Sequence, residues 1–251
     1  MESFRINSLI FMHLLLLSFF LFSKFFSINY KAQGQCIPAE SSALLQLKRG
    51  FTLVELKTWI PGTNCCSWEG MTCDEWRRVI GLDLNGQFIE GTIDPSLFNL
   101  TSLRNLSLAN NMFDGKSIPD SGWEHLANLS ILDLSFSGFV GKIPVGIARL
   151  TKLTSLCLSS HPHDLKNLSF TIKPTFLQNM SSLIELYLDN VDLSTYGNEW
   201  CDALANSTMI LEVLSMMGCS LFGFFPKHIF QMRNLKQLRY LKKSNAFWLY
   251  S

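Results

Sequence analysis

The sequence lacks a surplus of charge of either sign. It holds 21 lysine and arginine residues against 20 aspartate and glutamate residues, which leaves a formal net charge of +1. Proteins that bind nucleic acid use a basic surface to neutralise phosphates. The charge balance therefore argues against nucleic acid as a partner.

The sequence also lacks the motifs of common enzymes. It contains no Gly-x-Ser-x-Gly nucleophile motif and none of the signature segments of protein kinases. Gly115-Lys116-Ser117 is similar to the end of a phosphate-binding loop, but Asn110 stands where that loop needs its first glycine. We therefore predict that the protein is not an enzyme and needs no cofactor.

Metal-ligand spacings are equally scarce. No two cysteines have C-x-x-C spacing, and no histidines follow at zinc-finger distances. The segment His161-Pro162-His163-Asp164 could place two imidazoles on one side of an extended chain. It is better explained as a turn residue, His161, followed by an inserted loop that Pro162 opens. No metal site is predicted.

What the sequence does have is leucine at a regular spacing. Residues 100–119 follow the pattern L-x-x-L-x-x-L-x-L-x-x-N, which is the leucine-rich-repeat template of one short strand per coil. The two-residue period of a strand sends Leu106 and Leu108 to one side and Ser107 to the other. Such a coil cannot bury its apolar side alone, so it needs neighbours stacked on both faces.

The same spacing recurs along residues 79–241. The leucines that open the predicted strands are Leu82, Leu106, Leu132, Leu156, Leu186, Leu214 and Leu238. Three of the six steps between them are 24 residues long, and the longer steps place inserted loops at residues 161–176 and 188–208. We predict an α/β fold, a right-handed leucine-rich-repeat solenoid of about six and a half coils, followed by a divergent tail at residues 242–251.

Residues 1–34 have the composition of a secretory signal. A long apolar run from Leu9 to Ile28 is interrupted by His13 and Lys24, and residues 32–34, Ala-Gln-Gly, give the small-x-small pattern of a cleavage site. We favour a cleaved signal over a retained membrane anchor. The expected location is outside the cell, either secreted or at the extracellular face of the plasma membrane.

Residues 35–78 are expected to cap the first coil. Apolar residues at helical spacing predict a helix over residues 40–51, with Ser41 or Ser42 as its N-cap. Two tryptophans and four cysteines follow or flank it as a compact plug. In a secreted chain, seven cysteines argue for disulfides and leave at least one thiol unpaired, and four cysteines allow three pairings.

This segment resembles the N-terminal cap of plant extracellular leucine-rich-repeat proteins. The shared pattern is a first Cys, an Ala-Leu-Leu-x-x-Lys helix, a Trp, and then Cys-Cys-x-Trp-x-Gly-x-x-Cys. The resemblance implies the bridges Cys36–Cys65 and Cys66–Cys73. The Gly-x-Ile-Pro ending at residues 141–144 also resembles this plant subclass, in which it forms a second short strand.

Residues 188–208, together with residues 211–223, closely resemble receptor-like proteins of the Verticillium-wilt resistance type, plant immune receptors without a kinase. The resemblance implies a third bridge, Cys201–Cys219, and leaves Cys157 unpaired. Those receptors have longer repeat arrays and a membrane anchor. We therefore expect a truncated gene product that contacts a membrane only through a missing C-terminal region or a retained signal anchor.

Ligand binding is expected on the outward strand positions, which a curved solenoid lines up as a concave surface. Aromatic and acidic residues concentrate at some of these positions, and rigid aromatics are favoured anchors in interfaces. The predicted ligand-binding residues are Asp83, Asp133, Phe136, Glu185, Tyr187 and Asp189.

Six Asn-x-Ser/Thr sequons are candidate glycan acceptors in a secreted chain. The predicted glycosylation sites are Asn99, Asn128, Asn167, Asn179 and Asn206. The sixth, Asn105, ranks last because it faces the concave side, where a glycan would block part of the predicted binding surface.

The predicted function is extracellular recognition of a protein or peptide ligand in plant defence, with signalling left to partner proteins such as a co-receptor kinase. One alternative is a secreted inhibitor of fungal polygalacturonase, since such inhibitors use the same scaffold with a closed array of about ten coils. Another is a fragment without function.

Overall fold

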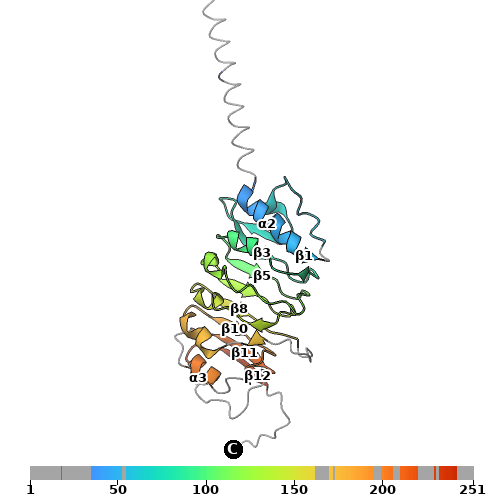
Figure 1. The fold of residues 1–251 in the computed structure, drawn as a ribbon. Coiled ribbons are helices and arrows are strands. Elements are labelled where there is room, and N and C mark those ends of the chain that lie inside the picture. Colours follow the sequence, from blue (N-terminus) through green and yellow to red (C-terminus); the bar gives the residue numbers. More distant parts are fainter. Residues whose placement is uncertain are drawn as a thin grey trace, which may run out of the picture.

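The computed structural model describes residues 18, 35–52, 55–161, 170–171, 173–194, 199–205, 210–219, 229 and 232–241. Apart from Ser18, the predicted signal lies outside the described residues, and so does the predicted tail. The described chain forms a single stack of coils, with helices α2 (Pro38–Gly50) and α3 (Glu199–Ala205) towards its opposite ends (Figure 1). None of the helices in the described part of the chain is long and apolar enough to cross a membrane.

The main sheet has eight strands in the order β12-β11-β10-β8-β6-β5-β3-β2. These strands are β2 (Met71–Cys73), β3 (Val79–Asp83), β5 (Asn105–Ser107), β6 (Ile131–Asp133), β8 (Ser155–Cys157), β10 (Glu185–Tyr187), β11 (Val213–Met217) and β12 (Gln237–Leu241). Within this sheet, the seven strands other than β2 pair in parallel, and β2 pairs antiparallel with β3. The seven leucines predicted to open strands are matched across these pairs in one unbroken register, which confirms the solenoid.

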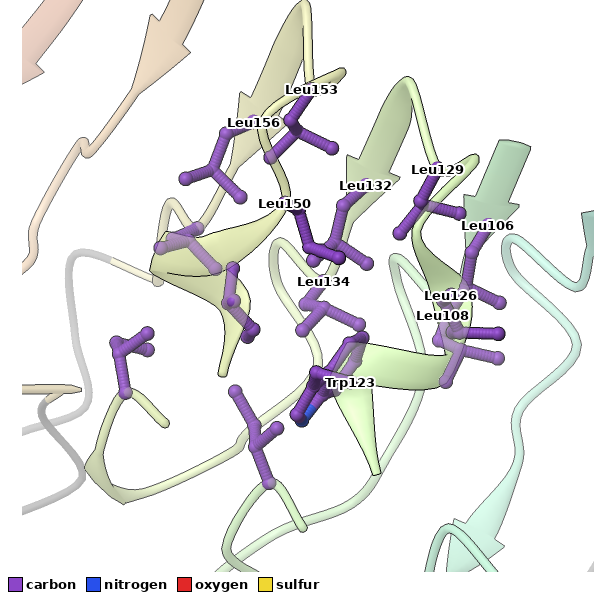
Figure 2. Close-up of a cluster of buried hydrophobic side chains, with 14 of the residues drawn as sticks. Leu106, Leu108, Trp123, Leu126, Leu129, Leu132, Leu134, Leu150, Leu153 and Leu156 are labelled. Atoms are coloured by element: carbon purple, nitrogen blue, oxygen red, sulfur yellow. The ribbon is translucent and has the colours of Figure 1, made fainter. Parts of the chain in front are cut away.

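Leucines from each strand point into a core that short 3-10 helices close. These helices are η1 (Cys65–Ser67) in the cap and η2 (Pro95–Asn99), η3 (Trp123–Leu126), η4 (Ile147–Arg149) and η5 (Pro174–Asn179) in the coils. Figure 2 shows Leu106, Leu132 and Leu156 from successive strands together with Trp123 in one apolar cluster. All four are fully buried. Since each strand exposes its leucines to the next coil, the core is continuous along the stack.

In several coils, a side chain at the asparagine position of the repeat holds the turn after the strand. The amide Nδ2 of buried Asn111 donates to the carbonyl oxygens of Leu84 and Leu108, and its Oδ1 accepts from the N–H of Ile89 at 3.0 Å. In the next coil, the Ser137 hydroxyl donates to the same Leu108 carbonyl. Val191 is fully buried and has no polar side chain, so this row of turn hydrogen bonds is interrupted in its coil.

Helix α2 begins two residues earlier than predicted. Pro38 occupies its first turn, where a missing N–H costs no hydrogen bond, and Ile37 is the N-cap. The prediction of Ser41 or Ser42 as the N-cap is wrong, because the Ser42 hydroxyl lies inside the helix and donates to the Pro38 carbonyl at 2.9 Å.

The cap is fixed to the first coil by covalent and polar contacts. The bridges Cys36–Cys65 and Cys66–Cys73 are present, as the resemblance implies. Buried Glu40 of α2 accepts a hydrogen bond from the N–H of Val79 at 2.8 Å, which joins the helix to the start of β3. Burial raises the pKa of this carboxyl.

Two pairs of two-residue strands lie outside the main sheet. Strands β1 (Phe51–Thr52) and β4 (Glu90–Gly91) pair antiparallel, while β7 (Gly141–Lys142) and β9 (Phe170–Thr171) pair in parallel. Strand β7 contains the start of the Gly-x-Ile-Pro segment, so the predicted second short strand is confirmed there. Helix α3 lies in the second predicted insertion, where the sequence indicated only a long coil.

The predicted bridge between Cys201 and Cys219 does not agree with the structure, in which Cys219 is a free, buried cysteine. Its thiol occupies the asparagine position of its coil and donates to the carbonyl oxygen of Leu188 at 2.8 Å. The Cys219 thiol therefore donates a hydrogen bond to the preceding coil, as the Asn111 amide does in its own coil. Cys157 is free, as expected.

Candidate ligand-binding face

The side chains that flank the strand leucines form two rows across the sheet. The first row, in strand order, contains Gly81, Asn105, Ile131, Ser155, Glu185, Val213 and Gln237. The second contains Asp83, Ser107, Asp133, Cys157, Tyr187, Ser215 and Arg239. Because strand residues alternate between the two sides of a sheet, both rows point away from the leucine core. We call these two rows the open face.

Cys157 lies at the centre of an acidic and aromatic cluster on the open face. Asp133 and Tyr187 are its neighbours in the second row. Burial raises the pKa of the Cys157 thiol to about 12, and the negative charges of Asp133, Glu185 and Asp189 add to this effect. Four of the predicted ligand-binding residues, Asp133, Glu185, Tyr187 and Asp189, are thus brought together around one thiol.

Hydroxyl groups of neighbouring coils hold the carboxylates of this cluster. Ser155 donates to Glu185 at 3.0 Å, and Ser215 donates to Asp189 at 2.6 Å. Asp189 also accepts from the N–H of Met217 at 2.7 Å. The ion pairs in the described part of the chain all lie elsewhere. Hydrogen bonds therefore hold Glu185 and Asp189 in a fixed geometry.

Two of the predicted residues lie apart from the cluster. Asp83 is on β3, two strands before Asp133 on β6, and borders a shallow hollow of about 700 Å³. Phe136 was expected at a strand position but lies beyond the two rows, at a corner where its φ is 53°. Its ring centroid is 5.2 Å from that of His161. Phe136 thus borders the open face and does not belong to its rows.

Sequence reasoning missed Arg239, which lies in the same row as Tyr187, one strand beyond Ser215. Burial and the negative charge of Glu185 raise the pKa of the Tyr187 hydroxyl, and the positive charge of Arg239 lowers it in part. The sequence could have predicted this outward position, because Arg239 follows Leu238 just as Tyr187 follows Leu186.

The described residues contain no group of three histidine, cysteine, aspartate or glutamate side chains that could hold a metal ion. Of the segment considered as a metal triplet, His161 is described, and Pro162, His163 and Asp164 lie outside the described residues.

The raised pKa of Cys157 leads to a testable expectation. At pH 8 the native thiol should react with iodoacetamide at least about a hundredfold more slowly than an ordinary thiol, since only the thiolate reacts. The rate should rise with pH towards about 12. Peptide mass spectrometry after timed alkylation measures this rate for Cys157 separately from Cys219. The unfolded chain in denaturant is the control, and equal native and unfolded rates would contradict the expected shielding.

Comparison with known proteins shows which proteins the chain resembles. The profile of the leucine rich repeat N-terminal domain matches residues 37–74. Receptor-like protein 6 of Arabidopsis thaliana is 32% identical over 238 residues, covering 82% of this chain and 23% of that protein. Receptor-like protein Cf-9 of Solanum pimpinellifolium is 32% identical over 225 residues, covering 88% of this chain and 24% of the relative. The chain is a relative of the plant leucine-rich-repeat receptor-like proteins. It spans about a quarter of the length of these curated relatives.

A solved structure has the same fold as this chain. The crystal structure of PEPR1-AtPEP1 matches with a TM-score of 0.63 at 25% identity, covering 82% of this chain and 28% of that one. The leucine-rich-repeat fold and the resemblance to plant receptor-like proteins are thus confirmed. The Verticillium-wilt type within that family stays a prediction.

Proposed function

We propose that the chain recognises a protein or peptide ligand outside the cell, in plant defence, through the open face. The observation that carries the proposal is the cluster of Asp133, Glu185, Tyr187 and Asp189. These side chains come from strands β6 and β10 and the turn after β10. Hydroxyl and backbone groups of adjacent coils orient Glu185 and Asp189. A fixed set of polar groups around an aromatic ring is what peptide recognition requires.

The family comparison supports this proposal in two ways. Its relatives are named receptor-like proteins, and the solved structure that it matches at 25% identity is that of PEPR1-AtPEP1. We extend to this chain a receptor-type role without catalysis, in which a co-receptor kinase transmits the signal. Asp83 and Phe136, at the margins of the open face, are proposed as secondary contacts.

The extracellular location is part of the same proposal. Cleavage of residues 1–34 would release the cap, residues 35–78, and the repeats, residues 79–241, into an oxidising compartment, and the two disulfides of the cap suit that environment. Of the proposed glycan acceptors, Asn99, Asn128 and Asn179 are exposed. Asn167 and Asn206 lie outside the described residues.

The proposal is tested by panning a displayed library of random peptides against the full chain secreted from plant cells. We expect the panning to enrich peptides that bind the cluster. Their affinity should fall about tenfold or more, or about 1.4 kcal/mol, for the variants Glu185→Gln and Tyr187→Ala, because each change removes a charge or a ring from the cluster. Affinity is measured by biolayer interferometry with the purified variants. Enrichment of peptides that bind all variants equally would contradict the proposed face.

Matched controls lie on the cap. Glu75→Gln and Trp76→Ala change an exposed carboxylate and an exposed aromatic ring far along the chain from the cluster, and both should leave peptide affinity unchanged. Defence signalling is read as a larger oxidative burst when leaves that express the chain meet fungal culture filtrate. Inhibition of fungal polygalacturonase by the secreted chain would favour the inhibitor alternative and overturn the receptor role.

A further inference from the structure

Among the sequon asparagines that the structure describes, Asn105 alone lies within the open face. It begins strand β5, it is exposed, and it is followed by Leu106 and Ser107, so it satisfies the Asn-x-Ser rule. The other described sequon asparagines lie away from the strands. Asn99 and Asn179 end the 3-10 helices η2 and η5, and Asn128 follows η3. A modification at Asn105 would therefore act directly on the proposed recognition surface.

The surroundings of Asn105 are closed on the side of Gly81 and exposed on the side of Ile131. Its neighbour in the first row on one side is buried Gly81, where an added Cβ would lie 3.0 Å from the Thr72 Cβ, so Thr72 occupies that side. On the other side lies Ile131, an apolar side chain that is 40% exposed. An exposed apolar side chain beside the attachment point is a surface on which a covering group gains contact area.

The amide of Asn105 is also available. Its Oδ1 accepts a long hydrogen bond of 3.4 Å from the hydroxyl of Ser130, and Nδ2 donates to no other side chain or carbonyl among the described residues. In Asn128, by contrast, Nδ2 donates to the Thr101 carbonyl at 3.3 Å and Oδ1 accepts from Lys152 at 2.8 Å. Attachment at Asn105 therefore breaks no hydrogen bond of the fold.

We propose that Asn105 carries an N-linked glycan whose first sugars lie over Ile131 and direct ligand binding towards the Tyr187 region of the open face. In the transfer, the Asn105 Nδ2 forms a bond to the anomeric carbon of a lipid-linked oligosaccharide diphosphate. The bond from that carbon to the phosphate oxygen breaks, the lipid diphosphate leaves, and the amide loses one proton. The inference rests on the proposed function, because the transfer requires entry into the secretory pathway.

This inference reverses the ranking drawn from the sequence, which placed Asn105 last because a glycan would block the binding surface. The structure shows where the blocked part lies. Asn105 is on β5, whereas the cluster around Cys157 draws on β6, β10 and the turn after β10. A glycan that extends from Asn105 over Ile131 therefore covers the open face at β5 and the start of β6, and it leaves the Tyr187 region on β10 accessible.

The test is glycan mapping on the full chain secreted from plant cells. Enzymatic removal of N-glycans in heavy-oxygen water converts each occupied asparagine to a labelled aspartate, which peptide mass spectrometry detects. We expect the label at Asn105 as well as at Asn99 and Asn179. Ser107→Ala removes the sequon but keeps Asn105, and it should abolish the label there. Ser107→Thr keeps the sequon and should retain it.

The outcomes separate this inference from the function on which it rests. Label at Asn99 and Asn179 without label at Asn105 would overturn the glycan at Asn105 and leave the extracellular role intact. Absence of label at every sequon would overturn both, because the chain would then not have passed through the secretory pathway.

Hydroxyl-radical footprinting tests where the sugars lie. If they cover Ile131, its oxidation in the native glycoprotein should rise when the glycan is lost in Ser107→Ala and stay low in Ser107→Thr. Val145, which is 68% exposed and lies in the turn before η4, serves as an internal reference whose oxidation should not change. Equal oxidation of Ile131 in both variants would overturn the proposed placement.

Discussion

Replacing Trp123 by alanine is expected to lower the free energy of unfolding by about 3–5 kcal/mol, because it removes the largest side chain from the core between two coils. Trp123 is fully buried, and its ring lies 5.3 Å from that of Phe98 in an edge-to-face contact. Its indole N–H donates to the Pro119 carbonyl at 2.8 Å. Figure 2 shows the ring among leucines from three successive strands.

The loss should extend beyond one coil, since stability in a solenoid depends on the contacts of each coil with its neighbours. Gly146 of the following coil approaches the Trp123 side chain so closely that a Cβ there would lie 3.0 Å from the Trp123 Cβ. Urea unfolding followed by circular dichroism measures the change. Trp76→Ala is the matched control, because Trp76 is 64% exposed. A Trp123→Ala loss no larger than that of the control would refute the packing account.

The second large effect is expected from Asn111→Ala, at about 3 kcal/mol or more. The change leaves the carbonyl of Leu84 and the N–H of Ile89 without the partner that Asn111 provides. The carbonyls of Leu108 and Ala109 also lose a bond but keep those from Ser137 and Gly86. Each buried polar group left without a hydrogen bond costs about 1–3 kcal/mol. The same urea titration measures the loss.

Asn111→Ser gives a graded comparison. Ser137 shows that a hydroxyl at this position can donate to the carbonyl of the preceding coil, at 2.6 Å from Leu108. Serine should therefore recover part of the stability that alanine loses. Gln87→Ala is the control at the same position of the first coil, where the side chain is exposed and makes one long bond of 3.4 Å to Asn85. Equal losses for alanine and serine would show that volume, and not hydrogen bonding, determines the effect.

Much of the open face could be read from the sequence because strand periodicity is local. Once Leu186 is placed inside, Glu185 and Tyr187 must point outward, and the structure puts them there. Phe136 was misplaced because the backbone turns into a left-handed conformation after Ser135, and leucine spacing carries no signal of that turn. Arg239 was overlooked, although the same periodicity applies to it.

The cysteines show the limit of arguing from resemblance. The two bridges of the cap hold because each cysteine lies in a segment that repeats the shared pattern closely. The resemblance also implied a third bridge, between Cys201 and Cys219. Cys219, however, occupies the asparagine position of its coil, where its thiol donates a hydrogen bond to the Leu188 carbonyl. The spacing of cysteines in the sequence does not indicate that Cys219 forms a hydrogen bond inside its own coil.

By itself, the sequence determined the solenoid, its seven parallel strands, the cap and the outward residues of the sheet, because all of these follow from short periods and local patterns. Only the tertiary structure decided which outward residues meet. Residues about 25 to 30 positions apart in sequence become neighbours through the stacking of coils, so burial, charge and hydroxyl donors converge on Cys157. The same stacking places Gly81 and Ile131 beside Asn105, which changes how that sequon is interpreted.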